Sequence, residues 1–263
     1  MATSRCVPPP VHPDASDQPE RHPMRLSDFT TLTFDCYGTL IDWESGIMGG
    51  LKPLIDQLGG RLDRDAILQA HARHESTQQR YNPSQCYSDL LTTVYRRLAE
   101  EWAIPVTAEA AALYGASVQH WPAFADSAES LAYLKSHFKL VILSNVDNAS
   151  FSYSNARLGV AFDAVYTAED VGAYKPAERN FDYMLEALEG HGISKADILH
   201  TAESMFHDHG PANRHGLHNC WIYRRHDKPG FGATRDPGDM PSVDFRFNSM
   251  AAMVAAHKAE QAG

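Results

Sequence analysis

The chain has 263 residues, of which 43% are hydrophobic, and this length suits one large domain or a core with a modest insertion. Its 23 Lys and Arg stand against 33 Asp and Glu, and the formal charge of -10 argues against nucleic acid or an anionic membrane as a partner. Four scattered cysteines without a CxxC pair argue against a disulfide framework, so we expect a reducing, cytoplasmic location.

Residues 1–23 hold six prolines and few large apolar side chains, a composition that predicts a disordered tail. Met24 is a candidate for the natural start of the chain. No apolar run approaches the roughly 18 to 20 residues that span a bilayer, and the N-terminus lacks the apolar segment of a signal peptide. We therefore expect no membrane partner.

The first predicted strand is the short apolar and β-branched run that ends at Phe34. Asp35 follows it directly, and Gly38 and Thr39 supply a tight turn. An acid is thereby left at the carboxyl end of a buried strand, the edge where open α/β sheets bind ligands. From this pattern alone, Asp35 could equally cap the following loop.

Residues 48–122 change to helical spacing. Leu91, Val94, Leu98 and Trp102 lie on one helical face, and further helices are predicted at about 64–80 and 107–119.

Strands then resume with helices between them. The predicted strands are 139–144, 164–168, 198–201 and 219–223, and a final helix covers about 249–262. Alternating strands and helices predict a mainly parallel, Rossmann-like α/β sheet with helices on both faces.

Polar residues recur at the ends of these strands. Ser144 and Asn145 could form an anion cradle, although Ser-Asn after a strand is also ordinary cap chemistry. Lys175 precedes a proline and, taken alone, reads as a solvated loop residue. Glu203 and Asp208 are two acids five residues apart after the fourth strand.

In this register the residues resemble the haloacid dehalogenase superfamily. The run from Phe34 to Asp42 (Phe-Asp-Cys-Tyr-Gly-Thr-Leu-Ile-Asp) is similar to its first motif, and the nearest resemblance is to the type II 2-haloacid dehalogenases. It implies a core of 24–47 and 123–263, with an inserted helical cap at 48–122 that closes over the site and selects the substrate.

The resemblance also implies roles for single residues. Asp35 would be the nucleophile, Lys175 would keep it ionised, and Thr39 would help to hold it. Asp208 would hold Lys175 or activate water. Ser144 would bind the substrate carboxylate with help from the Asn145 backbone, and Tyr37 would contact the substrate.

Tyr37 separates two chemistries. The superfamily's phosphatases have an Asp at this position, which protonates the leaving group, and Tyr with its reference pKa of about 10 cannot do so in the same way. A halide leaves without a proton, so Tyr37 favours dehalogenation. Glu203 favours the alternative, a Mg²⁺-dependent phosphohydrolase in which Asp35, Glu203 and Asp208 hold the metal.

The chain departs from the dehalogenases at several positions. Arg73 and Arg80 are the nearest candidates for the cap arginine that receives the halide, and Phe181 stands where the family has Tyr. Glu203 and Met205 replace polar residues. These departures leave open a third possibility, a non-catalytic binding protein of the same fold.

Five histidines lie close together in the last third of the chain, but no Cys-His spacing supports a zinc site. We expect their side chains to diverge, and His207 or His209 could assist Asp208 as a base. The five are His200, His207, His209, His215 and His218.

The sequence thus predicts a hydrolase that converts a short 2-haloacid to a 2-hydroxy acid through an aspartyl ester, similar to (S)-2-haloacid dehalogenases. We expect a small-molecule substrate and no cofactor, with Mg²⁺ only in the phosphohydrolase alternative. The resemblance also implies a homodimer.

Overall fold

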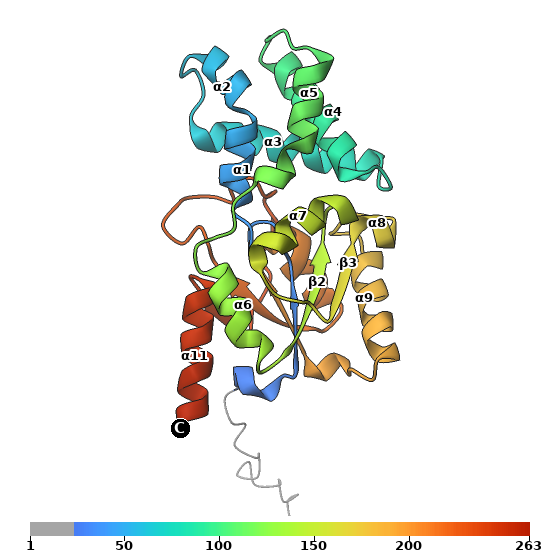
Figure 1. Ribbon diagram of the computed structural model, residues 1–263, viewed down its shortest axis with the longest axis vertical. Helices are drawn as coiled ribbons and strands as arrows, with labels where there is room; N and C mark the ends of the chain where they lie inside the picture. Colours follow the sequence, from blue (N-terminus) through green and yellow to red (C-terminus); the bar gives the residue numbers. More distant parts are fainter. Residues whose placement is uncertain (1–23) are drawn as a thin grey trace, which may run out of the picture.

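The computed structural model describes residues 24–263. At its centre lies a six-stranded parallel sheet with the strand order β3-β2-β1-β4-β5-β6. Helices surround the sheet, which confirms the predicted Rossmann-like α/β class (Figure 1). The strands are β1 (Thr31–Phe34), β2 (Lys139–Ser144), β3 (Ala164–Thr167), β4 (Ile198–Ala202), β5 (His218–Ile222) and β6 (Phe245–Phe247).

The strand order reverses beside β1. The chain passes from β1 to β2 and β3 on one side, and then crosses to β4, β5 and β6 on the other. In open α/β sheets, ligands bind beyond the carboxyl ends of the strands at such a reversal. The residues that follow β1, β2 and β4 therefore occupy the edge where a site is expected.

Helices cover both faces of the sheet. Successive side chains of β2 point to opposite faces. Leu140 and Ile142 pack in a core cluster with side chains of α6, α7 and α11, whereas Val141 and Leu143 pack in a second cluster with side chains of α9 and α10. These helices and short turns are η1 (Leu26–Asp28), α6 (Ser127–Lys135), α7 (Asn148–Leu158), α8 (Ala168–Val171), α9 (Arg179–Gly190), η3 (Lys195–Asp197), η4 (Met205–His209), α10 (Gly210–Arg214) and α11 (Met250–Ala262).

A helical insertion separates β1 from β2 in the sequence and lies at the top of the molecule in Figure 1. The predicted amphipathic helix is α4, whose apolar residues Leu91, Val94 and Leu98 are buried while Arg96 is exposed. The helices of the insertion are α1 (Trp43–Gly50), α2 (Lys52–Leu58), α3 (Arg64–Tyr81), α4 (Tyr87–Glu101), α5 (Ala108–Gly115) and the 3-10 helix η2 (Ala116–His120). Its division from the core at 48 and 122 stays a prediction.

Some element boundaries differ from the predicted ones. The first helix of the insertion starts at Trp43, because the Asp42 carboxylate accepts the Ser45 N–H and caps it. The predicted helix at 107–119 divides into α5 and η2. The three-residue strand β6 is absent from the prediction, since so short a run carries little periodic signal.

Two predictions concern the ends and surface of the chain. The tail at 1–23 lies outside the described residues. Within residues 24–263, no helix has the length and apolar character needed to cross a membrane.

Candidate active site

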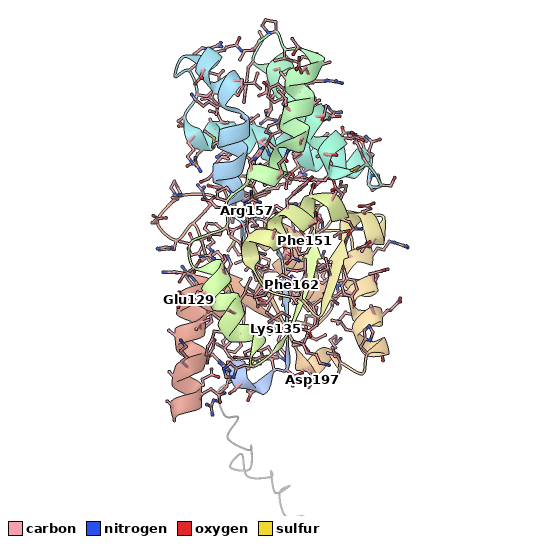
Figure 2. The ribbon with its side chains drawn as sticks, viewed as in Figure 1. Glu129, Lys135, Phe151, Arg157, Phe162 and Asp197 are labelled. Carbon is pink, nitrogen blue, oxygen red and sulfur yellow. The ribbon has the colours of Figure 1, made fainter. Side chains whose placement is uncertain are left out.

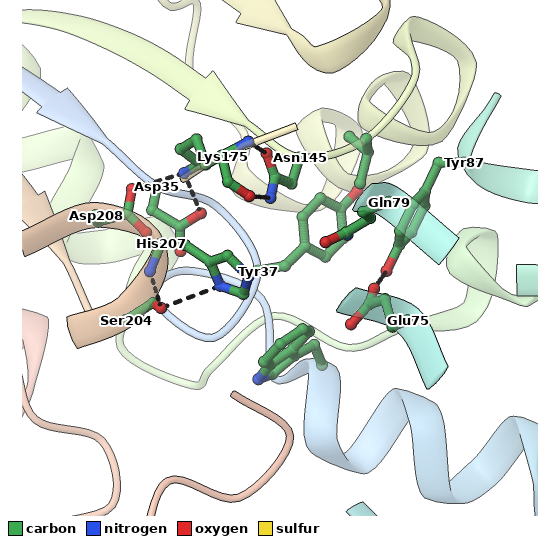
Figure 3. A pocket seen from close by; sticks show the side chains of 12 residues that line it. Asp35, Tyr37, Glu75, Gln79, Tyr87, Asn145, Lys175, Ser204, His207 and Asp208 are labelled. Carbon is green, nitrogen blue, oxygen red and sulfur yellow. Dashed lines mark hydrogen bonds and ion pairs between the residues drawn. The ribbon is translucent and has the colours of Figure 1, made fainter. Parts of the chain in front are cut away.

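A small cavity lies beyond the carboxyl end of the sheet, where the core meets the helical insertion (Figure 3). The core lines it with residues that follow β1, β2 and β4, and α1, α3 and α4 of the insertion line it from the other side. The core residues include Asp35, Tyr37, Asn145, Lys175, His207 and Asp208. Segments far apart in the sequence thus meet around the carboxylate of Asp35.

Asp35 is fixed through both its backbone and its side chain. Its N–H donates to the carbonyl of Thr201 in β4 at 3.1 Å, and the residue is only 5% exposed. Thr39 Oγ1 donates to Asp35 Oδ2 at 2.7 Å, and Lys175 Nζ donates to Oδ1 at 2.9 Å. Burial raises the pKa of Asp35, the Lys175 charge opposes that rise, and Asp208 adds to it. Thr39 and Lys175 both donate hydrogen bonds to the carboxylate, and such donors favour its ionised form.

The turn after Asp35 explains why Thr39 can reach back to it. Gly38 has φ 97°, a left-handed conformation that glycine adopts without steric cost. The Glu203 N–H donates to Thr39 Oγ1 at 2.9 Å, so the same hydroxyl that donates to Asp35 is held from the segment after β4. The predicted contact between Asp35 and Thr39 is therefore present.

Lys175 is the cation of the cavity. Its Nζ donates to Asp35 Oδ1, to Asp208 Oδ1 at 2.7 Å and to the Leu143 carbonyl at 2.8 Å, which uses all three hydrogens. Asn145 fixes its backbone, because Oδ1 accepts the Lys175 N–H at 2.6 Å and Nδ2 donates to the Lys175 carbonyl at 3.0 Å. Burial lowers the pKa of Lys175, but the charges of Asp208 and Asp35 outweigh burial and raise it.

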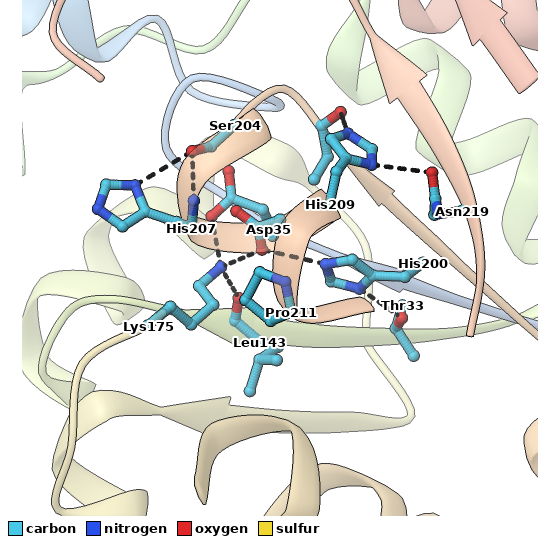
Figure 4. Close-up of polar contacts among 12 residues, drawn as sticks. Thr33, Asp35, Leu143, Lys175, His200, Ser204, His207, His209, Pro211 and Asn219 are labelled. Carbon is cyan, nitrogen blue, oxygen red and sulfur yellow. Dashed lines mark hydrogen bonds and ion pairs between the residues drawn. The ribbon is translucent and has the colours of Figure 1, made fainter. Parts of the chain in front are cut away.

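Asp208 lines the cavity and belongs to a buried polar network with Lys175 and His200, both of which Figure 4 labels. Its Oδ1 accepts from Lys175 and contacts His200 Nε2 at 3.0 Å, and His200 Nδ1 lies 2.8 Å from Thr33 Oγ1. Burial alone raises the pKa of Asp208, but the Lys175 charge and the His200 contact hold it well below its ordinary range. Asp208 is therefore an ionised partner of Lys175 and a weak base.

Asn145 and Ser144 have different surroundings. The Asn145 side chain faces the cavity but is engaged with the Lys175 backbone. The Ser144 hydroxyl is buried and has no hydrogen-bond partner among the described residues. Its predicted role in binding the substrate carboxylate stays a prediction.

Tyr37 lines the cavity with its ring, and its hydroxyl points to α7. The hydroxyl lies 2.7 Å from Ser154 Oγ and donates to the Ser150 carbonyl at 3.3 Å. Burial raises the pKa of Tyr37 well above its ordinary value. The Tyr37 hydroxyl is therefore neutral and already bonded.

Glu203 is not among the residues that line the cavity of Asp35. It lines a neighbouring cavity together with Glu44 and Arg225, whereas Asp35 and Asp208 line the first one. Burial, followed by the charge of Glu44, raises the pKa of Glu203 to about 8. In residues 24–263 no three His, Cys, Asp or Glu side chains form a group that could hold a metal ion. The three predicted metal ligands of the phosphohydrolase alternative are thus not gathered into one site.

The clustered histidines diverge, as predicted. His200 belongs to the Asp208 network, and His209 contacts Asn219 Oδ1 and the Ala202 carbonyl, both at 3.0 Å. His207 alone of the five lines the cavity. The remaining two, His215 and His218, pair with Glu178, Asp182 and Asp244 away from the cavity.

The helical insertion contributes polar residues that the sequence did not single out. Glu75 and Gln79 lie one turn apart on α3 and are buried, and the Tyr87 hydroxyl of α4 donates to Glu75 Oε1 at 2.7 Å. Burial raises the pKa of Glu75 to about 7. Two polar residues four positions apart on a helix normally lie on its solvent-exposed face. The sequence therefore gave no sign that Glu75 and Gln79 line a cavity.

Neither predicted halide arginine lines the cavity. Arg73 pairs with Glu101 on the surface of the insertion at 2.6 Å. Arg80 lines an adjoining groove, which shares Gln79 and Lys175 with the cavity. Among the described lining residues, Lys175 is the only Lys or Arg. The insertion therefore brings no arginine to the lining of this cavity, and it does bring the polar side chains of Glu75, Gln79 and Tyr87.

Comparison with known families gives one match that spans most of the chain. The family model described as haloacid dehalogenase-like hydrolase matches residues 29–201. This range includes Asp35, Ser144 and Lys175, and ends just before Glu203 and Asp208.

Individual relatives carry dehalogenase names. A protein of Pseudomonas sp. (strain YL) named (S)-2-haloacid dehalogenase is 28% identical over 242 residues, covering 88% of this chain and 97% of that protein. A Pseudomonas putida protein of the same name is 29% identical over 109 residues, 40% of this chain and less than half (46%) of its own length. The solved structure of L-2-haloacid dehalogenase from Xanthobacter autotrophicus with chloropropionic acid covalently bound superposes with a TM-score of 0.68 at 18% identity, covering 86% of this chain and 97% of that one. At 18% identity, this structural similarity shows a shared fold.

Proposed function

Because the chain belongs to the haloacid dehalogenase-like hydrolase family, we propose that it hydrolyses the carbon–halogen bond of a short 2-haloacid, with Asp35 as the nucleophile. The names of the Pseudomonas relatives support this substrate class. The product would be a 2-hydroxy acid and a free halide.

The observation that carries the proposal lies two residues after Asp35. Tyr37 is neutral, and its hydroxyl is bonded to Ser154 and Ser150, so it is not poised to protonate a leaving group. A phosphate ester needs such a proton for its leaving alkoxide, whereas a halide leaves as a stable anion. Tyr37 therefore favours carbon–halogen cleavage over phosphoryl transfer.

The first step would be an in-line displacement. A carboxylate oxygen of Asp35 attacks C2 of the substrate, the new C–O bond forms, and the halide departs with the electron pair of the C–X bond. Lys175 and Thr39 hold the carboxylate at 2.9 and 2.7 Å, which orients it before substrate arrives. The product of this step is an ester between Asp35 and the substrate carbon.

The second step would be hydrolysis of that ester at the Asp35 carboxyl carbon. Water attacks this carbon, the tetrahedral intermediate expels the alkoxide, and the 2-hydroxy acid leaves. Lys175 stays charged between Asp35 and Asp208, and it stabilises the negative charge that develops on the carboxyl oxygen. The covalently bound chloropropionic acid named for the Xanthobacter structure supports an intermediate of this kind.

The helical insertion would act as the predicted cap. Glu75, Gln79 and Tyr87 line the cavity together with Asp35, and its small volume favours a short substrate. We propose that the substrate carboxylate binds at Ser144 and the neighbouring backbone N–H groups, since the Ser144 hydroxyl has no partner among the described residues. This reaction uses no metal ion.

The test is chloride release from L-2-chloropropionate and chloroacetate, with and without EDTA, beside a phosphate-ester assay with Mg²⁺. We expect chloride release that survives EDTA and is lost in Asp35→Asn. Asp56→Asn is the matched control, because Asp56 pairs with Lys52 on the surface. In heavy-oxygen water, a single turnover should place the label in Asp35 and leave the product unlabelled.

Two results would replace the proposal. Mg²⁺-dependent phosphate release without chloride release would establish the phosphohydrolase alternative and make Glu203 a metal ligand. If neither substrate reacts and a partner binds Asp35→Asn as well as the unaltered protein, the chain is a binding protein of this fold.

A further inference from the structure

Hydrolysis of an aspartyl ester requires a group that takes a proton from water, and the proposed function leaves this group open. Lys175 is charged and donates all three hydrogens, so it cannot serve. Asp208 accepts from Lys175 at Oδ1, whereas its Oδ2 is buried without a partner among the described residues. The Lys175 charge and the His200 contact hold the pKa of Asp208 well below its ordinary range, so this carboxylate takes up a proton poorly. Met205 stands where the dehalogenases have a polar residue, and its thioether is too weak an acceptor to take a proton from water.

His207 has the geometry of a base. It is the third residue of the π-helical turn η4 and is 9% exposed. Ser204 Oγ accepts the His207 backbone N–H at 2.9 Å and lies 3.1 Å from Nδ1, so the turn fixes the ring. Nε2, the other ring nitrogen, is buried and has no hydrogen-bond partner among the described residues. A buried polar atom without a partner calls for an explanation.

The surroundings of His207 fit this role. The ring lines the same cavity as Asp35, and both close-up views draw it beside Asp35 and Lys175 (Figures 3 and 4). Burial lowers the pKa of His207 to about 4, and the Asp208 charge partly offsets the effect, so the imidazole is neutral near pH 7. Neutral imidazole with Nδ1–H donated to Ser204 presents a lone pair at Nε2.

We infer that His207 is the general base of the second step, a catalytic residue in addition to Asp35, and this inference rests on the proposed function. Nε2 removes a proton from water as the water oxygen bonds to the Asp35 carboxyl carbon. The tetrahedral intermediate then breaks its bond to the alkoxide, which takes the proton back from Nε2–H. Asp35 is left as the acid and releases its proton to solvent. The ionised Asp208, next in sequence, stabilises the transient imidazolium.

The test separates the two chemical steps in His207→Gln. Glutamine fills a similar volume and can bond Ser204, but it cannot take a proton. With L-2-chloropropionate we expect about one chloride per active site in a rapid burst, followed by turnover reduced roughly 10² to 10⁴-fold. Intact-mass analysis should then find one carboxyethyl group per chain, and peptide mapping should locate it on Asp35.

His209→Gln is the matched control, because His209 lies two residues on in the same turn but does not line the cavity. We expect this variant to turn over without accumulating the adduct, and thermal melting of both variants checks that they fold. Should His207→Gln be unfolded, His207→Asn is tested in the same way.

Other outcomes contradict the inference. Normal turnover of His207→Gln without adduct, or loss of the chloride burst itself, would show that His207 is not the base. Adduct accumulation in Glu75→Gln but not in His207→Gln would assign the base to Glu75. If the unaltered protein releases no chloride and forms no adduct, the proposed function itself fails, which is a distinct result.

Discussion

Lys175 holds two buried carboxylates together. It is 1% exposed and donates to both Asp35 and Asp208, and its loss would leave two like charges in the interior without a cation. Breaking a buried pair on one side costs about 3 to 5 kcal/mol. We expect Lys175→Met to lower the free energy of unfolding by about this amount, measured by urea denaturation.

Lys52→Met is the control for this effect. Lys52 also pairs with a carboxylate, Asp56, but its side chain is 71% exposed. Surface pairs contribute about 0 to 1 kcal/mol. Equal losses in the two variants would contradict the structural role assigned to Lys175.

Glu75 should give stability a measurable pH dependence. Its pKa is raised from 4.5 to about 7 in the folded protein, because the carboxyl is buried. The contribution of Glu75 to the free energy of unfolding is fully present below pH 4.5, where the carboxyl is protonated in both the folded and the unfolded protein. It is lost as the pH rises through about 7. Relative to Glu75→Gln, the unaltered protein should lose about 3 kcal/mol of unfolding free energy between pH 4.5 and 7.5.

Glu75→Gln isolates this one group. Its amide oxygen can still accept the Tyr87 hydroxyl, and Glu203, whose pKa is also raised, is present in both proteins, so its effect cancels. The measurement is a set of denaturation curves across this pH range. Parallel curves for the two proteins would mean that Glu75 is ionised in the folded state.

At the scale of elements, α1 joins β1 to the rest of the helical insertion and packs on the segment that returns to the core. Gly46 lies on its inner face, where an added Cβ would come within 2.3 Å of Trp121 Cγ. Trp121 is fully buried, and its Nε1 donates to Ser117 Oγ at 3.2 Å, so the ring has little freedom to move. A glycine is therefore required at 46 by close packing.

The same helix provides its own control. We expect Gly46→Ala to cost about 1 to 3 kcal/mol through overpacking. Gly49 is exposed, and an added Cβ would meet nothing within 4 Å, so Gly49→Ala should gain about 0.5 to 1 kcal/mol from helix propensity. Urea denaturation of both variants checks the opposite signs, and a loss at both positions would contradict this packing.

At the scale of the whole molecule, Arg225 links the core to the helical insertion. It follows β5, donates through one nitrogen to both oxygens of Glu44 in α1 at 2.6 and 2.8 Å, and through another to Asp65 Oδ1 in α3 at 3.0 Å. Arg225 and Glu44 are both buried. This ion pair fixes the position of the insertion over the cavity.

We expect Arg225→Ala to destabilise the protein by about 3 kcal/mol, because the buried Glu44 carboxylate then keeps only the more distant and exposed Arg64, at 3.7 Å. A looser insertion should also raise KM for the 2-haloacid and quicken proteolysis between the core and the insertion. Arg73→Ala is the control, since the Arg73–Glu101 pair is exposed and within the insertion. Equal KM values for Arg225→Ala and the unaltered protein would contradict the proposed link.

Side-chain contacts within the core join segments far apart in the sequence, and Figure 2 labels Lys135, Phe151 and Phe162, which take part in them. Lys135 of α6 donates to Asp163 at 2.6 Å, and Phe151 of α7 packs against Phe162 with ring centroids 6.1 Å apart. Both contacts join helices of one face of the sheet to the segment before β3. The core is therefore connected across the sequence independently of the helical insertion.

The sequence by itself determined the fold class and the place of Asp35, the proposed nucleophile. Apolar and β-branched runs alternating with helices specify a parallel sheet, and an acid directly after the first run must lie at the carboxyl edge, because strand direction is fixed by the chain. The family membership of the chain agrees with that pattern. These features are local, so one sequence was sufficient to find them.

Only the tertiary structure decided which side chains share the cavity. Glu75 and His207 line the cavity of Asp35, whereas Arg80 lines the adjoining groove and Glu203 a second cavity. These choices depend on how the helical insertion docks on the core and how the turn after β4 is wound. Packing between distant segments sets both, and neither periodicity nor spacing in the sequence records it.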